Sequence, residues 1–76
     1  MQPLLVSHYQ AKWNAHHHSG TIVLISQGVE YPLPAMQAPE FHALIDLLRN
    51  ERPIYFDPTH GDIFTRNEMV GEEEMD

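Results

Sequence analysis

The chain has 76 residues, of which 42% are hydrophobic, and it contains no cysteine. This length allows one small domain with a marginal core, and the lack of cysteine excludes disulfides and thiolate metal sites. No apolar run approaches the roughly 20 residues of a membrane-spanning helix, and the first ten residues lack the pattern of a signal peptide. We therefore expect a cytoplasmic protein that does not enter a membrane.

The net charge of −7 is concentrated at the C-terminal end of the sequence. We assign residues 1–67 to a single α+β domain and residues 68–76 to an acidic C-terminal tail. The tail contains no lysine or arginine, and its acidic residues are Glu68, Glu72, Glu73, Glu74 and Asp76. The whole chain has only four lysine and arginine residues, too few for the basic surface that phosphate contact requires. This excludes direct binding of nucleic acid.

The first half of the chain predicts extended segments. Residues 4–13 are ambiguous, because neither alternating face is cleanly apolar, but Val, Tyr and Trp favour a strand over a short helix. Residues 21–27, TIVLISQ, form the clearest strand, since β-branched side chains favour extended backbone. Their unbroken apolar run predicts burial on both faces, either at the centre of the sheet or against a second subunit.

A turn and a shorter strand follow this central strand. Gln27 and Gly28 predict the turn. Residues 29–33 alternate in polarity, and Pro32 places this strand at an edge of the sheet because it cannot donate a ladder hydrogen bond.

The middle of the chain predicts one amphipathic helix. Pro39 suits the first turn of a helix, and Pro53 ends the helix by Arg52. Apolar residues at i, i+3, i+4 and i+7 form a single stripe, which Leu47 widens. The residues of the stripe are Phe41, Leu44, Ile45 and Leu48.

Residues 53–65, PIYFDPTHGDIFT, predict a β-hairpin. Asp57 can accept hydrogen bonds from turn amides, Pro58 presets the next φ angle, and Gly61 can adopt the positive φ that closes such a loop. The order of elements predicts an α+β fold of the ββαββ type, in which two hairpins flank the helix. We expect one small antiparallel sheet of four or five strands with the helix packed on one face.

The stretch NAHHHSG, residues 14–20, raises the question of a metal site. On a strand, His16 and His18 would share one face and could hold Zn²⁺ or Ni²⁺. A site of this kind needs a third ligand, which the sequence spacing does not supply. The alternative, which we favour, is a polar connector leading into the strand at Thr21, with no cofactor in the protein.

Catalytic arrangements are weakly indicated. His42 and Asp46 lie one helical turn apart, and His60 lies between two aspartates of the predicted hairpin loop. Neither histidine has a Ser or Cys nucleophile beside it in the sequence pattern. A chain of this size also has little room for a deep pocket, so we favour a protein that is not an enzyme.

The sequence therefore predicts a small interaction module that self-associates. One helix covers only one face of a sheet, so a second copy would cover the other face of the central strand and form a homodimer. The residues predicted to take part in this contact, or in contact with another protein partner, are Ile22, Leu24, Tyr55 and Phe64. The alternative function is that of a transition-metal-binding accessory protein that uses His16 and His18.

Overall fold

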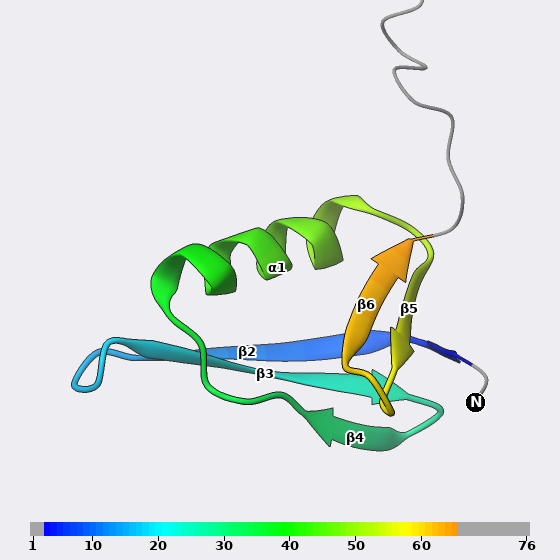
Figure 1. The fold of residues 1–76 in the computed structure, drawn as a ribbon, viewed down its shortest axis with the longest axis horizontal. Helices are drawn as coiled ribbons and strands as arrows, with labels where there is room; N and C mark the ends of the chain where they lie inside the picture. Colours follow the sequence, from blue (N-terminus) through cyan, green and yellow to red (C-terminus); the bar gives the residue numbers. More distant parts are fainter. Residues whose placement is uncertain (1–2, 66–76) are drawn as a thin grey trace, which may run out of the picture.

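The computed structural model describes residues 3–65 and confirms an α+β fold (Figure 1). The single helix of this part of the chain, α1, spans Ala38–Asn50. The strands of the same region are β1 (Leu4–Leu5), β2 (His8–Asn14), β3 (Ser19–Ser26), β4 (Val29–Pro32), β5 (Ile54–Asp57) and β6 (Asp62–Thr65). The acidic tail that the sequence predicts for residues 68–76 lies outside the described residues.

The strands form two three-stranded antiparallel sheets, in the orders β2-β3-β4 and β1-β5-β6. The prediction of one sheet of four or five strands is therefore wrong. The N-terminal segment divides between the sheets: β1 pairs with β5, whereas β2 pairs with β3. Figure 1 shows the β5–β6 hairpin standing crosswise at one end of the longer sheet. The predicted hairpins are both present, but the second one pairs with β1 and starts a sheet of its own.

The central strand β3 buries one face rather than two. Ile22 and Leu24 have no exposed surface, and burial alternates with exposure along the strand. Val23 and Ile25 point to the opposite face and are half-buried. The prediction of burial on both faces is wrong for the single chain, because α1 lies over one face of this sheet and none of residues 3–65 forms a layer over the other (Figure 1).

The helix packs through the stripe that its sequence predicts. Phe41 is the buried residue of α1, and it packs with Ile22, Leu24 and Phe56 in the core. Leu44, Ile45 and Leu48 pack against this cluster. Burial of a large apolar side chain stabilises the fold by about 1.5 to 3 kcal/mol. The core therefore lies where α1, the inner face of β3 and the inner face of β5 meet.

Local signals fix the ends of the elements. The two-residue turn between β3 and β4 has positive φ at both Gln27 (53°) and Gly28 (78°), the geometry that matches the twist of a tight hairpin. Pro39 lies in the first turn of α1, and the backbone N–H of Gln37 donates to the Glu40 carboxylate (3.2 Å). Pro32 lies on β4, which is an edge strand as predicted.

After β4 the chain continues along β3 and places the start of the helix. The backbone N–H of Leu33 donates to the carbonyl of Ile22 (2.9 Å). Gly20 and Met36 then exchange two backbone hydrogen bonds of 2.8 and 2.9 Å. Phe41 lies directly over Gly20 as a result. In residues 3–65 there is no helix with the length and apolar character needed to cross a bilayer.

Candidate interaction surfaces

The face of the β1-β5-β6 sheet that points away from the core carries an apolar row. Leu5 pairs with Tyr55, and Tyr55 pairs with Phe64, so the three side chains lie on one face across all three strands. Their neighbours Leu4, Phe56 and Ile63 point to the opposite, inner face. We call Leu5, Tyr55 and Phe64 the outer row.

The outer row is accessible to solvent. Leu5 is 53% exposed, Phe64 is 39% exposed, and Tyr55 between them is half-buried. The rings of Tyr55 and Phe64 stack at a centroid distance of 5.8 Å and an interplanar angle of 26°. Stacking holds the two rings in one orientation, so the row presents a fixed apolar ridge.

Of the four residues predicted to make contacts, two are on this ridge and two are inside the core. Tyr55 and Phe64 lie side by side in the outer row. Ile22 and Leu24 have no exposed surface, so in this fold they have no area to offer a partner. The sequence reasoning missed Leu5, because its place opposite Tyr55 depends on the pairing of β1 with β5.

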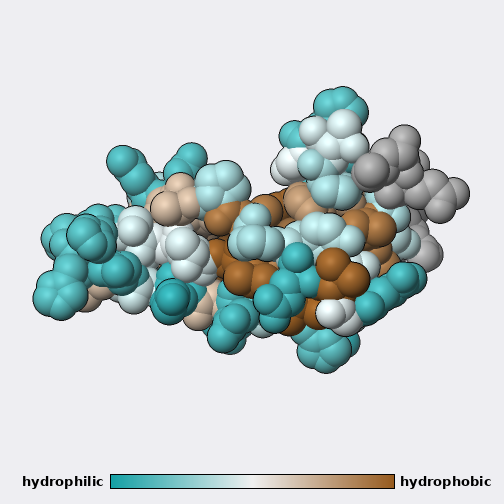
Figure 2. All heavy atoms as spheres, turned by 90° about the horizontal axis from the view of Figure 1, so that it is seen from below, coloured by the Kyte–Doolittle hydropathy of each residue, from teal (hydrophilic) through white to brown (hydrophobic). Residues whose placement is uncertain are grey.

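The far face of the β2-β3-β4 sheet is a second uncovered surface. Val23 and Ile25 are half-buried there, but their cross-strand partners on β2 are the polar Gln10 and His8. Figure 2 looks toward this side of the molecule and shows hydrophobic surface interrupted by hydrophilic side chains. A polar border of this kind is typical of a solvated sheet face.

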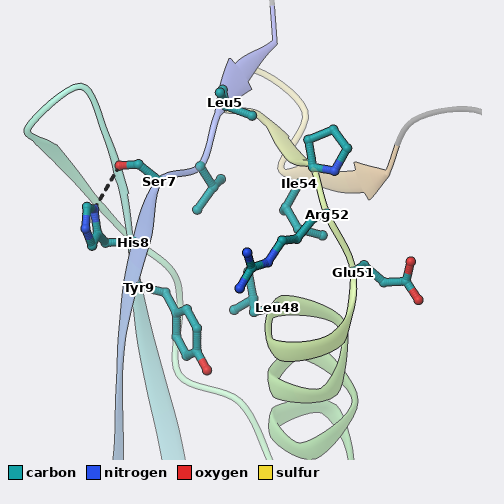
Figure 3. Close-up of a pocket in the computed structure, with 10 residues that line it drawn as sticks. Leu5, Ser7, His8, Tyr9, Leu48, Glu51, Arg52 and Ile54 are labelled. Atoms are coloured by element: carbon teal, nitrogen blue, oxygen red, sulfur yellow. Dashed lines mark hydrogen bonds between the residues drawn. The ribbon is translucent and has the colours of Figure 1, made fainter.

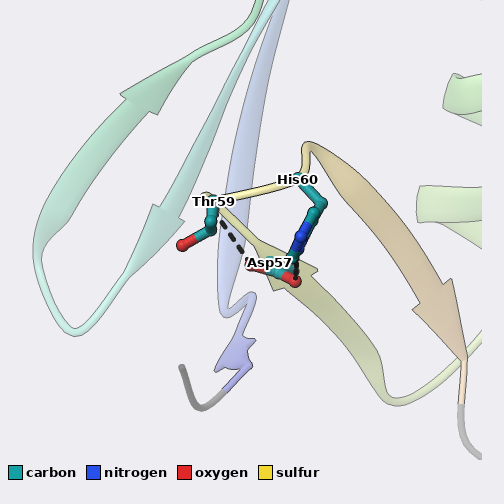
Figure 4. Close-up of polar contacts among 3 residues, drawn as sticks. All are labelled: Asp57, Thr59 and His60. Carbon is teal, nitrogen blue, oxygen red and sulfur yellow. Dashed lines mark hydrogen bonds and ion pairs between the residues drawn. The ribbon is translucent and has the colours of Figure 1, made fainter.

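The turn between β5 and β6 is organised by Asp57 (Figure 4). Its carboxylate accepts hydrogen bonds from the backbone N–H of Thr59 (2.9 Å) and from Nδ1 of His60 (2.8 Å). Its carbonyl oxygen accepts from the N–H of Gly61 (2.7 Å), whose φ is 76°. The predicted roles of Asp57 and Gly61 in this turn are confirmed.

Asp57 and His60 also shift each other's titration. The hydrogen bond and the charge of the carboxylate raise the pKa of His60, and the hydrogen bond from His60 lowers the pKa of Asp57. Both groups lie at the surface, and the imidazole is bonded to an acid that already accepts a turn amide. The pair is therefore part of the hydrogen-bond network that forms the β5–β6 turn.

The histidine stretch forms the turn that joins β2 to β3. The Asn14 side-chain oxygen accepts hydrogen bonds from the backbone N–H groups of His16 (2.9 Å) and His17 (3.1 Å). His18 has a positive φ of 54°, which reverses the chain. All three histidines are exposed, and the described part of the chain contains no group of three or more metal-ligating side chains. His16 and His18 thus lie on a turn rather than on a strand face.

The helix histidine is also at the surface. His42 and Asp46 are both exposed on the side of α1 away from the core.

Comparison with protein-family models, with curated proteins and with solved structures gives no match for this chain. The geometry of the chain itself is therefore the basis for its functional assignment.

Proposed function

We propose that this protein is a small non-enzymatic interaction module that self-associates through the outer row. The observation that carries the proposal is the unbroken line of Leu5, Tyr55 and Phe64, which crosses all three strands on one face of the sheet. Exposed apolar surface that is continuous, rather than scattered, marks interaction sites. The partner is a second copy of the chain, and the alternative partner is another protein that carries a matching apolar ridge.

The outer row suits a symmetric contact. In a two-fold dimer the same patch faces itself, and two sheets pack face to face at about 10 Å through side chains of this size. Asp57 and Asp62 are paired on the same face beyond the aromatic pair. Two facing sheets would have to keep these acids apart, so the contact is centred on Leu5 and Tyr55. Three side chains are a small interface, and we expect a weak dimer that depends on concentration.

The outer row supports this function better than the far face of the other sheet. On the far face, Val23 and Ile25 belong to one strand and have polar neighbours on β2. In the outer row every strand contributes a large side chain with an apolar body, and the Tyr55 hydroxyl is the one polar side-chain group among the three.

Sedimentation equilibrium tests the proposal. We expect the purified chain to shift from monomer to dimer between about 10 μM and 1 mM, the range of weak complexes. Phe64→Lys places a charge in the row and should leave a monomer across this range. Val29→Lys is the matched control, because Val29 is 51% exposed but lies on β4, outside the row. A monomer at every concentration of the unaltered chain contradicts the proposal, as does equal weakening by both variants.

A further inference from the structure

A groove opens between the N-terminal strands and the C-terminal end of the helix (Figure 3). Its volume is about 780 Å³, within the size range of ligand sites in proteins. One wall is formed by residues 5–9, and the other by the end of α1 together with the loop that leads into β5. The groove is separate from the outer row except for Leu5, which belongs to both.

The fold opens this groove where one strand changes partners. The backbone N–H of Val6 donates to the carbonyl of Ile54 (2.9 Å), next to the β1–β5 pairing. The N–H of Ser7 already donates to the carbonyl of Ile25 (2.8 Å) in the other sheet. Beyond this point β2 is an edge strand of its sheet. Edge strands carry unpaired backbone groups that an extended peptide can pair with.

The groove combines apolar side chains with two charged residues, Glu51 and Arg52. Val6, Leu48 and Ile54 supply apolar side chains. Figure 3 shows the Arg52 guanidinium reaching into the space between β2 and the end of α1, while the Glu51 carboxylate points away from it. No carboxylate of residues 3–65 forms an ion pair with Arg52. A guanidinium beside an apolar surface is suited to an anionic group attached to an apolar ligand, and it binds a carboxylate with two parallel hydrogen bonds.

We propose that this groove binds the C-terminal end of an extended peptide whose last residue is apolar. The terminal carboxylate pairs with Arg52, the last side chain packs against the half-buried Val6 and Leu48, and the peptide backbone runs along the free edge of β2. The choice of an anionic terminus follows from charge complementarity: the chain as a whole carries −7, yet the charged group that reaches into this groove is a cation. The inference goes beyond the proposed self-association and uses a surface that shares only Leu5 with the outer row.

Titration of the ¹⁵N-labelled chain with a five-residue peptide tests the inference. The probe alternates threonine and valine and ends in leucine with a free carboxylate. We expect amide shifts confined to residues 5–14, which include the whole of β2, and to residues 48–54, with about tenfold weaker binding when the peptide carries a C-terminal amide. Arg52→Gln should weaken binding of the free-acid peptide by a similar factor. Arg49→Gln is the matched control, since Arg49 is exposed in the last turn of α1 but does not line the groove.

Three results would overturn the inference. The first is the absence of amide shifts at millimolar peptide with a chain that is shown to be folded. The second is equal binding by the Arg52→Gln and Arg49→Gln variants. The third is binding of decanoate as tight as that of the peptide, because a fatty acid makes no backbone hydrogen bonds and its equal affinity would mean that the β2 edge contributes nothing. Dimerisation is measured by sedimentation, so a failure of peptide binding does not bear on the proposed self-association through the outer row.

Discussion

Gly20→Ala adds one methyl group where the sheet lies in close contact with Phe41 of the helix. A Cβ atom at this position would lie 2.2 Å from Cδ1 of Phe41 and 2.5 Å from its Cγ, far inside van der Waals contact. The backbone of Gly20 cannot easily retreat, because two hydrogen bonds tie it to Met36. The opposite residue on β2 is Trp13, whose ring lies 5.6 Å from that of Phe41. The aromatic side chains therefore occupy the space that the glycine leaves.

The methyl group must displace the Phe41 ring. Overpacking of this kind costs about 1 to 3 kcal/mol. Part of this overpacking cost is offset, because glycine in a strand is about 0.5 to 1 kcal/mol less favourable than alanine. We expect a net loss of about 1 to 2 kcal/mol in the free energy of unfolding, and each kcal/mol lowers the Tm of a domain of this size by about 4 to 8 °C.

Urea unfolding followed by tryptophan fluorescence measures this loss, because Trp13 is the single tryptophan and lies beside Phe41. The same substitution in a Phe41→Leu background should cost about 1 kcal/mol less, since the aromatic ring that clashes is gone. If Gly20→Ala is as stable as the unaltered chain, or costs the same in both backgrounds, the contact between Gly20 and Phe41 does not limit the packing.

Three further predictions follow from the turns. NMR titration should give His60 a pKa above its ordinary 6.5, and Asp57→Asn should return that pKa toward 6.5 while keeping the bond to the Thr59 amide. The stabilisation from this pair is complete between about pH 3.8 and 6.5. It is lost as pH rises through the raised pKa of His60 or falls through the lowered pKa of Asp57, which pH-dependent urea unfolding can follow. Gln27→Asn should stabilise the chain by about 0.5 kcal/mol in thermal unfolding, because asparagine tolerates the positive φ of this turn better than glutamine. Zinc at a few equivalents should leave the Tm unchanged, because the imidazoles of the exposed turn lack a converging third ligand; a rise that His16→Ala together with His18→Ala abolishes would establish a metal site.

Short-range patterns predicted most of the elements of this protein. A few neighbouring residues explain each of three features: the first turn of the helix with its proline, the turn organised by Asp57, and the helical stripe of Phe41, Leu44, Ile45 and Leu48. The strand character of residues 21–26 is likewise set by β-branched side chains. These features depend on local backbone and side-chain preferences, which a single sequence carries in full.

The candidate surfaces could be predicted only in part. Tyr55 and Phe64 were predicted to lie on one hairpin and to make contacts, because Asp57 and Gly61 mark the turn between them, whereas their direct pairing was shown by the structure. Leu5 could not be placed beside them, since β1 and β5 are separated by almost fifty residues and only tertiary pairing joins them. The groove at Arg52 has no sequence signal, because two sheets and the helix end have to meet to form it.

The amino-acid sequence by itself determined where α1, β3, β4 and the β5–β6 hairpin lie, because each follows from periodicity, β-branched residues or a turn residue. Tertiary structure alone decided that the strands divide between two sheets, that Ile22 and Leu24 face the core while Val23 and Ile25 do not, and that Gly20 lies beneath Phe41. The physical reason is that an unbroken apolar run fits either face of a strand equally well. Which face is buried depends on where the other elements pack, and that is settled by contacts between residues far apart in the chain.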